Sequence, residues 1–120
     1  MSKKTLVLGA SLKVSRYSNI AVRRLREQNI PVKAFGLRAG SIADVYVDVE
    51  RKEYKELDTI TLYLNPKRQE EFYDYILSLK PDRVIFNPGT ENGELISLLK
   101  QHGIESEVAC TLVLLSMNQY

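Results

Sequence analysis

Short apolar runs alternate along this chain with longer segments that have one apolar helical face. The predicted strands span residues 5–8, 32–35, 59–64, 83–87 and 104–108. The first of them has a β-branched bias and is typical of a strand buried on both faces. Because neighbouring parallel strands need long crossover connections, this alternation predicts a mostly parallel sheet with helices on both faces. With 120 residues, the chain has room for a single α/β domain over 1–120.

The boundaries of the predicted helices carry local signals. Ser18 is expected to cap the first helix. Asn65 and Pro66 supply an N-cap followed by proline at the first helical position, and Pro81 ends that helix. Gly103 is expected to end the last predicted helix. These signals favour a three-layer Rossmann-like fold with about five mostly parallel strands.

Two stretches are harder to interpret. Residues 41–57 hold no long apolar run, although Val45, Val47 and Val49 alternate as in a strand. Residues 108–117 form an apolar run that is too short to span a bilayer, and they are expected to be a buried strand and its continuation.

Composition excludes several classes of protein. The sequence has seventeen Lys and Arg and fifteen Asp and Glu, which gives a formal net charge of only +2. Neither sign forms a long run of like charges along the chain. Arg23, Arg24 and Arg26 are expected to be a solvated helix face, so no nucleic-acid partner is predicted. The polar start at residues 1–4 is unlike a signal peptide, and the lone Cys110 excludes an internal disulfide. A cytoplasmic protein without a membrane partner is expected.

Residues able to perform catalysis are few. His102 is expected to cap a helix C-terminus, and Cys110 lies in an apolar run where it is expected to fill space. Glu91 is the best candidate acid or base, although a carboxylate near a helix N-terminus is also explained by the helix dipole. No cluster of metal-ligand residues occurs at the usual spacing. The sequence therefore favours a binding protein over an enzyme and predicts no metal site.

Ligands of open α/β sheets bind beyond the carboxyl ends of the strands. Four loops are expected there, at residues 9–17, 36–40, 65–67 and 87–91. The first leads into a helix N-terminus, whose N–H groups and dipole favour an anion. Its glycine, its hydroxyls and a nearby Lys or Arg are suited to a phosphate.

The same loops differ from a dinucleotide site. The fingerprint of such a site has three glycines, and here only Gly9 is present. After the second predicted strand, where an acidic residue would bind the ribose hydroxyls, Gly36-Leu37-Arg38 offers a cation. Arg38 suits an additional phosphate on the ribose, which both NADP and coenzyme A (CoA) carry.

The stretches Leu8-Gly9-Ala10-Ser11 and Arg16-Tyr17-Ser18, with the order of elements around them, resemble the small stand-alone CoA-binding proteins (the YccU-like group). This family is similar in fold to the N-terminal CoA-binding domain of the succinyl-CoA synthetase alpha subunit. The resemblance implies that the pyrophosphate lies at Gly9, Ala10, Ser11, Arg16 and Ser18, and Tyr17 between them is also predicted to bind the ligand. It implies that Gly36 and Arg38 lie by the adenosine ribose and its phosphate. It also implies ligand contacts at the turn of Asn65, Pro66 and Lys67, and at Pro88, Gly89, Thr90 and Glu91 beside the pantetheine arm.

The predicted function is therefore that of a small cytoplasmic module that binds CoA or an acyl-CoA. Two alternatives remain open at this point. One is an NADP-binding reductase or its remnant. The other is a protein-interaction module in which residues 113–117 dock a partner or a second copy, as a homodimer.

Overall fold

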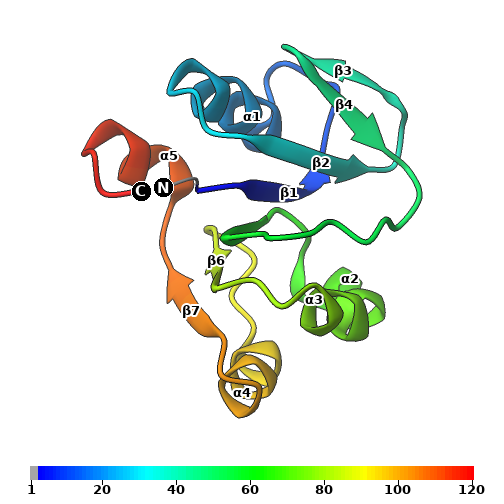
Figure 1. Ribbon diagram of the computed structural model, residues 1–120, viewed down its shortest axis with the longest axis vertical. Helices are drawn as coiled ribbons and strands as arrows, with labels where there is room; N and C mark the ends of the chain where they lie inside the picture. Colours follow the sequence, from blue (N-terminus) through cyan, green and yellow to red (C-terminus); the bar gives the residue numbers. More distant parts are fainter. Residues whose placement is uncertain (1–2) are drawn as a thin grey trace.

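A seven-stranded sheet forms the centre of the computed structural model, which describes residues 3–120 (Figure 1). The first two residues of the predicted polar start lie outside the described part. The strand order is β3-β4-β2-β1-β5-β6-β7, and every neighbouring pair is parallel except β3 with β4. The strands are β1 (Thr5–Ala10), β2 (Val32–Gly36), β3 (Gly40–Ile42), β4 (Val45–Asp48), β5 (Thr59–Leu62), β6 (Arg83–Phe86) and β7 (Glu105–Val108).

Helices cover both faces of this sheet. They are α1 (Tyr17–Glu27), α2 (Pro66–Gln69), the 3-10 turn η1 (Glu70–Phe72), α3 (Tyr73–Leu79), α4 (Gly93–Gln101) and α5 (Thr111–Ser116). Helices α1 and α5 lie on one side of the sheet, and α2, α3 and α4 lie on the other (Figure 1). Successive residues of β1 accordingly enter different cores: Leu6 and Leu8 pack with α3 and α4, whereas Val7 packs with α1. The predicted α/β fold with a mostly parallel sheet is confirmed.

The predicted number of strands is wrong, because seven strands are present instead of about five. The additional strands come from the stretch that lacked a clear pattern. There β3 and β4 form an antiparallel hairpin with Ile42 paired to Val45, and a two-residue turn with Ala43 at φ 53° joins them. A three-residue strand is too short to give a periodic signal.

The expectation for residues 108–117 is also wrong. The strand β7 ends at Val108, whose side chain is 60% exposed, and α5 follows from Thr111. Thr111 and Leu115 are buried and lie one helical turn apart, so the apolar spacing in this stretch is helical. Cys110 precedes α5 and is only partly buried, so it does not fill a core. Within residues 3–120, no helix is both long and apolar enough to cross a membrane.

The order of strands creates one crevice. The chain leaves β1 toward β2 on one side, and it later returns to β5 on the other side of β1. Ligands of open α/β sheets bind at such a reversal, beyond the carboxyl ends of the strands.

Candidate ligand-binding cleft

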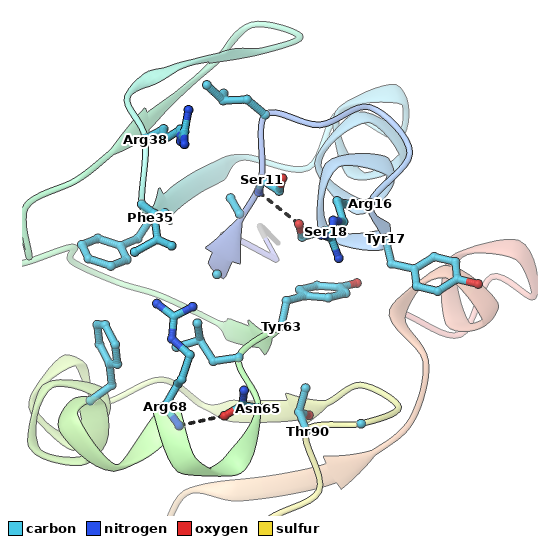
Figure 2. A pocket seen from close by; sticks show the side chains of 18 of the residues that line it. Ser11, Arg16, Tyr17, Ser18, Phe35, Arg38, Tyr63, Asn65, Arg68 and Thr90 are labelled. Atoms are coloured by element: carbon cyan, nitrogen blue, oxygen red, sulfur yellow. Dashed lines mark hydrogen bonds between the residues drawn. The ribbon is translucent and has the colours of Figure 1, made fainter.

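A cleft of about 830 Å³ opens at this reversal, between the loops that follow β1, β2, β5 and β6 (Figure 2). Its volume lies within the range of ~300–1,000 Å³ that is usual for small-molecule sites. The cleft is lined by Gly9, Ala10, Ser11, Leu12, Arg16, Tyr17, Ser18, Phe35, Gly36, Leu37, Arg38, Val49, Arg51, Tyr63, Leu64, Asn65, Arg68, Glu71, Phe72, Pro88, Gly89 and Thr90. It therefore brings together all the predicted site residues except Pro66, Lys67 and Glu91.

The loop after β1 is held by hydrogen bonds to the start of α1. The Ser11 N–H donates to the Ser18 hydroxyl oxygen at 3.1 Å, and the Asn19 amide donates to the Ser11 carbonyl at 2.9 Å. The prediction that Ser18 caps α1 is wrong, since Arg16 is the N-cap and makes no side-chain cap bond. Arg16, Tyr17 and Ser18 at the start of α1 line the cleft. The first N–H groups of a helix have no partner within it, so α1 presents the positive end of its dipole at the rim of the cleft.

Tyr17 is among the lining residues, but its ring points away from the centre of the cleft (Figure 2). Its side chain is 72% exposed. The Tyr17 ring is therefore not placed to stack on a ligand, and this residue can contribute only its main chain at the first turn of α1.

The loop after β2 approaches the loop after β1 closely. A Cβ atom on Gly36 would lie 2.1 Å from the Ala10 carbonyl oxygen, so only glycine fits at this crossing. Beyond it, Leu37 and Arg38 are exposed and line the cleft. Gly36 thus brings Arg38 to the same cleft as the N-terminus of α1.

The turn after β5 begins α2 as predicted. Asn65 accepts a hydrogen bond from the Arg68 N–H at 2.9 Å, and Pro66 occupies the first turn. This turn brings Asn65 and Arg68 to the cleft, whereas Pro66 and Lys67 lie outside the lining. Sequence reasoning missed Arg68 because it assigned the turn by its motif alone.

Gln69 is fully buried behind the cleft and was also missed. Its side-chain amide donates to the carbonyls of Leu64 and Thr90, each at 2.8 Å, and accepts from the Asn92 amide at 2.9 Å. Gln69 therefore ties the loop after β5 to the loop after β6. It lies three residues before the buried Phe72, so helical spacing from that residue could have revealed it.

The loop after β6 presents Pro88, Gly89 and Thr90 to the cleft. Thr90 is buried, and its hydroxyl donates to the Asn87 carbonyl at 2.7 Å. The Glu91 carboxylate accepts from the Gly89 N–H at 2.8 Å and does not line the cleft. Glu91 therefore stabilises the loop and is not placed as an acid or base within the cleft.

Aromatic side chains form part of the wall. The rings of Phe35 and Phe72 meet edge to face with centroids 5.5 Å apart, and the Arg51 guanidinium lies 4.2 Å above the Phe72 ring. Tyr63 also lines the cleft, and its burial raises the pKa of its hydroxyl to about 12 despite the neighbouring hydroxyls of Thr111 and Thr61. Tyr63 is therefore neutral at physiological pH.

The eight arginines of the chain divide into two groups. Five have an ion pair or a side-chain hydrogen bond within residues 3–120, and they are Arg23, Arg24, Arg26, Arg51 and Arg83. The remaining three, Arg16, Arg38 and Arg68, make neither contact with the described residues, and all three line the cleft.

This pattern also corrects the interpretation of α1 as carrying a merely solvated basic face. Arg26 pairs with Asp44 at 2.8 Å, and Arg23 donates to Asn19 and to the Val14 carbonyl. Among the described residues, the arginines that lack partners line the cleft at the carboxyl ends of the strands instead.

The residues considered for catalysis lie elsewhere. His102 is the C-cap residue of α4, and its Nδ1 lies 2.9 Å from the Leu98 carbonyl oxygen. Neither His102 nor Cys110 lines the cleft. No group of three or more His, Cys, Asp and Glu side chains in residues 3–120 could hold a metal ion.

Solved structures with the same fold have been found by comparison. One, described only as the crystal structure of an uncharacterized protein, is 45% identical with a TM-score of 0.96, over 100% of this chain and 99% of the other. A Thermus thermophilus protein is 24% identical with a TM-score of 0.86, over 99% and 91% of the two chains. A conserved hypothetical protein from Pyrococcus furiosus is 24% identical with a TM-score of 0.81, over 92% and 97%. No curated protein matches the chain.

The sequence also matches a family model described as a CoA binding domain, over residues 3–116. The match spans every helix and strand of the structure. It includes the four loops that form the cleft. By this match over nearly its whole length, the chain belongs to the CoA binding domain family.

Proposed function

We propose that the protein binds CoA or an acyl-CoA in the cleft at the carboxyl ends of β1, β2, β5 and β6. The observation that carries the proposal is the gathering of Arg16, Arg38 and Arg68 around one cleft without acidic partners among the described residues. Exposed guanidinium groups without carboxylates are suited to phosphate, which they bind with two parallel hydrogen bonds. Membership of the CoA binding domain family supports the same ligand.

The phosphates of CoA fit the two basic regions of the cleft. Its pyrophosphate would lie at Ser11 and the first turn of α1, where backbone N–H groups and Arg16 favour an anion. Its 3′-phosphate would lie near Arg38, in the loop after β2. The pantetheine arm would extend along Gly89 and Thr90 after β6.

NADP is the principal alternative ligand, because its 2′-phosphate could also use Arg38. A reductase would further need an acid or base beside the nicotinamide. The Glu91 carboxylate binds the Gly89 N–H outside the lining, and His102 lies at the end of α4. Glu71 lines the cleft, but its carboxylate pairs with Arg51 at 3.6 Å. Together with the family match, this favours a CoA-binding module, and we propose no catalytic step for it.

A panel of thermal-unfolding measurements with CoA, dephospho-CoA, NADP and NAD tests this proposal. A ligand present at 100 times its dissociation constant adds about 2.7 kcal/mol to the free energy of unfolding. CoA should give the largest shift, and dephospho-CoA should give a smaller one because it lacks the 3′-phosphate. A larger shift with NADP than with CoA would reject the proposal.

Substitution of Arg38 tests its assigned role. Arg38→Ala should weaken the binding of CoA by about 1.5–3 kcal/mol, the usual contribution of a hydrogen bond to a charged group. The affinity for dephospho-CoA should stay unchanged. Titration calorimetry with both ligands measures the difference. Arg24→Ala is the matched control, since Arg24 is exposed on α1 with only a 3.9 Å pair to Glu27. An unchanged preference for CoA in Arg38→Ala would reject this role.

Two further expectations complete the proposal. With one cysteine in the sequence, no disulfide can form within the chain, which agrees with a cytoplasmic location. Self-association through residues 113–117 stays a prediction, favoured by the exposed side chains of Val113 and Met117 on and after α5. Sedimentation of the free protein tests it, and a monomer at all concentrations would contradict it.

A further inference from the structure

Arg68 lies across the cleft from the N-terminus of α1. We propose that its guanidinium is the second side of a clamp for the diphosphate of the ligand, with Ser11, Arg16 and the first turn of α1 as the first side. This inference deepens the proposed CoA-binding function and rests on it.

The backbone of Arg68 is held in place by its neighbours. Its N–H donates to the Asn65 side chain at 2.9 Å, with Pro66 in the same turn. The next residue, Gln69, is fully buried and bonded to the carbonyls of Leu64 and Thr90. The base of the Arg68 side chain is therefore fixed relative to both loops that flank it.

The Arg68 side chain extends into the cleft. In Figure 2 it extends from α2 between Phe35 and Tyr63, toward the loop that carries Ser11. It makes no ion pair or side-chain hydrogen bond with the residues that the structure describes. Arg51 in the same lining differs, since it lies over the Phe72 ring and pairs with the Glu71 carboxylate at 3.6 Å.

A diphosphate can accept donors from more than one side, because each of its phosphates carries charge and several acceptor oxygens. The α1 N-terminus supplies backbone N–H groups from one direction. A guanidinium supplies paired N–H donors that match phosphate oxygens. Arg38 lies in the loop after β2, beyond Gly36, which leaves Arg68 as the unpartnered lining arginine on the β5 side of the crevice, among the residues that the structure describes.

Titration calorimetry on four proteins tests the clamp: the wild type, Arg68→Ala, Arg68→Lys and Lys67→Ala. CoA, dephospho-CoA and ADP all carry a diphosphate. Arg68→Ala should therefore lower the affinity for each of them by a similar factor, about 10- to 100-fold. Arg68→Lys should recover part of this loss, because it keeps the charge without the paired donors. Lys67 is exposed and lies outside the cleft lining, so Lys67→Ala should bind like the wild type.

Adenosine 3′,5′-bisphosphate has phosphates but no diphosphate, so Arg68→Ala should leave its affinity nearly unchanged. Equal loss with this ligand would overturn the clamp, because Arg68 would then act only as a general charge. A loss confined to CoA and adenosine 3′,5′-bisphosphate, the two ligands that carry a 3′-phosphate, would also overturn it, since Arg68 would then bind that phosphate. Unchanged affinities for all ligands would overturn it as well.

The same titrations separate the clamp from the proposed function. If the wild type binds ADP but not CoA, and Arg68→Ala weakens ADP, the clamp is supported and the CoA proposal fails. If the wild type binds CoA and Arg68→Ala binds it equally well, the clamp fails and the CoA proposal is supported. If the wild type binds none of the diphosphates, both fail.

Discussion

Gly36 and Ala10 lie so close that no side chain fits between the loops after β1 and β2. A Cβ at position 36 would lie 2.1 Å from the Ala10 carbonyl oxygen and 3.2 Å from a methyl group of Val47. Gly36→Ala should lower the free energy of unfolding by about 1–3 kcal/mol, the usual cost of overpacking, and should weaken ligand binding by displacing Arg38. Denaturant unfolding measures the first effect.

Gly93 provides the control for this substitution. It begins α4, and a Cβ there would meet no atom within 4 Å. Gly93→Ala should therefore be neutral or slightly stabilising. Equal stability of the Gly36→Ala and Gly93→Ala proteins would contradict the close approach of the two loops.

Tyr63 makes stability depend on pH in a defined window. Burial raises the pKa of its hydroxyl from 10.0 to about 12, so the folded protein retains a proton that the unfolded chain loses. The contribution is fully present below pH 10 and is lost as the pH rises toward 12. Tyr63→Phe should therefore lose stability less steeply than the wild type across this window in urea unfolding. Identical slopes for the two proteins would contradict this assignment.

At the scale of elements, Gln69 joins the loop after β5 to the loop after β6. Gln69→Leu keeps similar bulk but removes both donors to the Leu64 and Thr90 carbonyls and the acceptor for Asn92. Loss of these buried bonds should cost about 2–4 kcal/mol in the free energy of unfolding. Gln101→Leu at the exposed end of α4 should change it by only about 0.5 kcal/mol. Equal effects would show that Gln69 does not hold the loops together.

The elements that could be predicted from the sequence are those with strong periodicity. The apolar runs of β1, β5 and β6 and the cap at Asn65 each follow from local chemistry. The three-residue strand β3 is too short to give a pattern, whereas β4 coincides with the alternation of Val45 and Val47. The helix α5 was missed because the apolar run at 108–117 begins at Val108, the last residue of β7, and was therefore interpreted as a continuation of that strand.

The candidate cleft could be predicted only in part for a related reason. Loops that follow strands could be placed at one edge of the sheet by topology alone, which is how Ser11, Arg38 and Thr90 were found. Arg68 and Phe72 reach the cleft from within helical segments, and Arg51 reaches it from the loop after β4. Their directions depend on tertiary packing, which a local motif does not contain.

At the scale of the whole molecule, positive and negative charges are nearly equal in number, but the arginines differ in whether a neighbouring group binds them. A formal charge of +2 gives no sign of an anion site. Within residues 3–120, the arginines away from the cleft are engaged by neighbouring groups, whereas three arginines of the cleft are not. A second cavity, of about 620 Å³, lies beside Lys33 and Lys52. Unlike those three arginines, Lys52 has an acidic partner among the described residues, since it pairs with Asp48 at 2.9 Å.

The most direct test of CoA binding at the carboxyl-end cleft is the backbone amide NMR spectrum of the 13.7 kDa protein during titration with CoA. The account predicts the largest shift changes at Ser11, at the first turn of α1, at Arg38 and at Thr90. The absence of changes at millimolar CoA, or changes confined to the cavity beside Lys33 and Lys52, would contradict it.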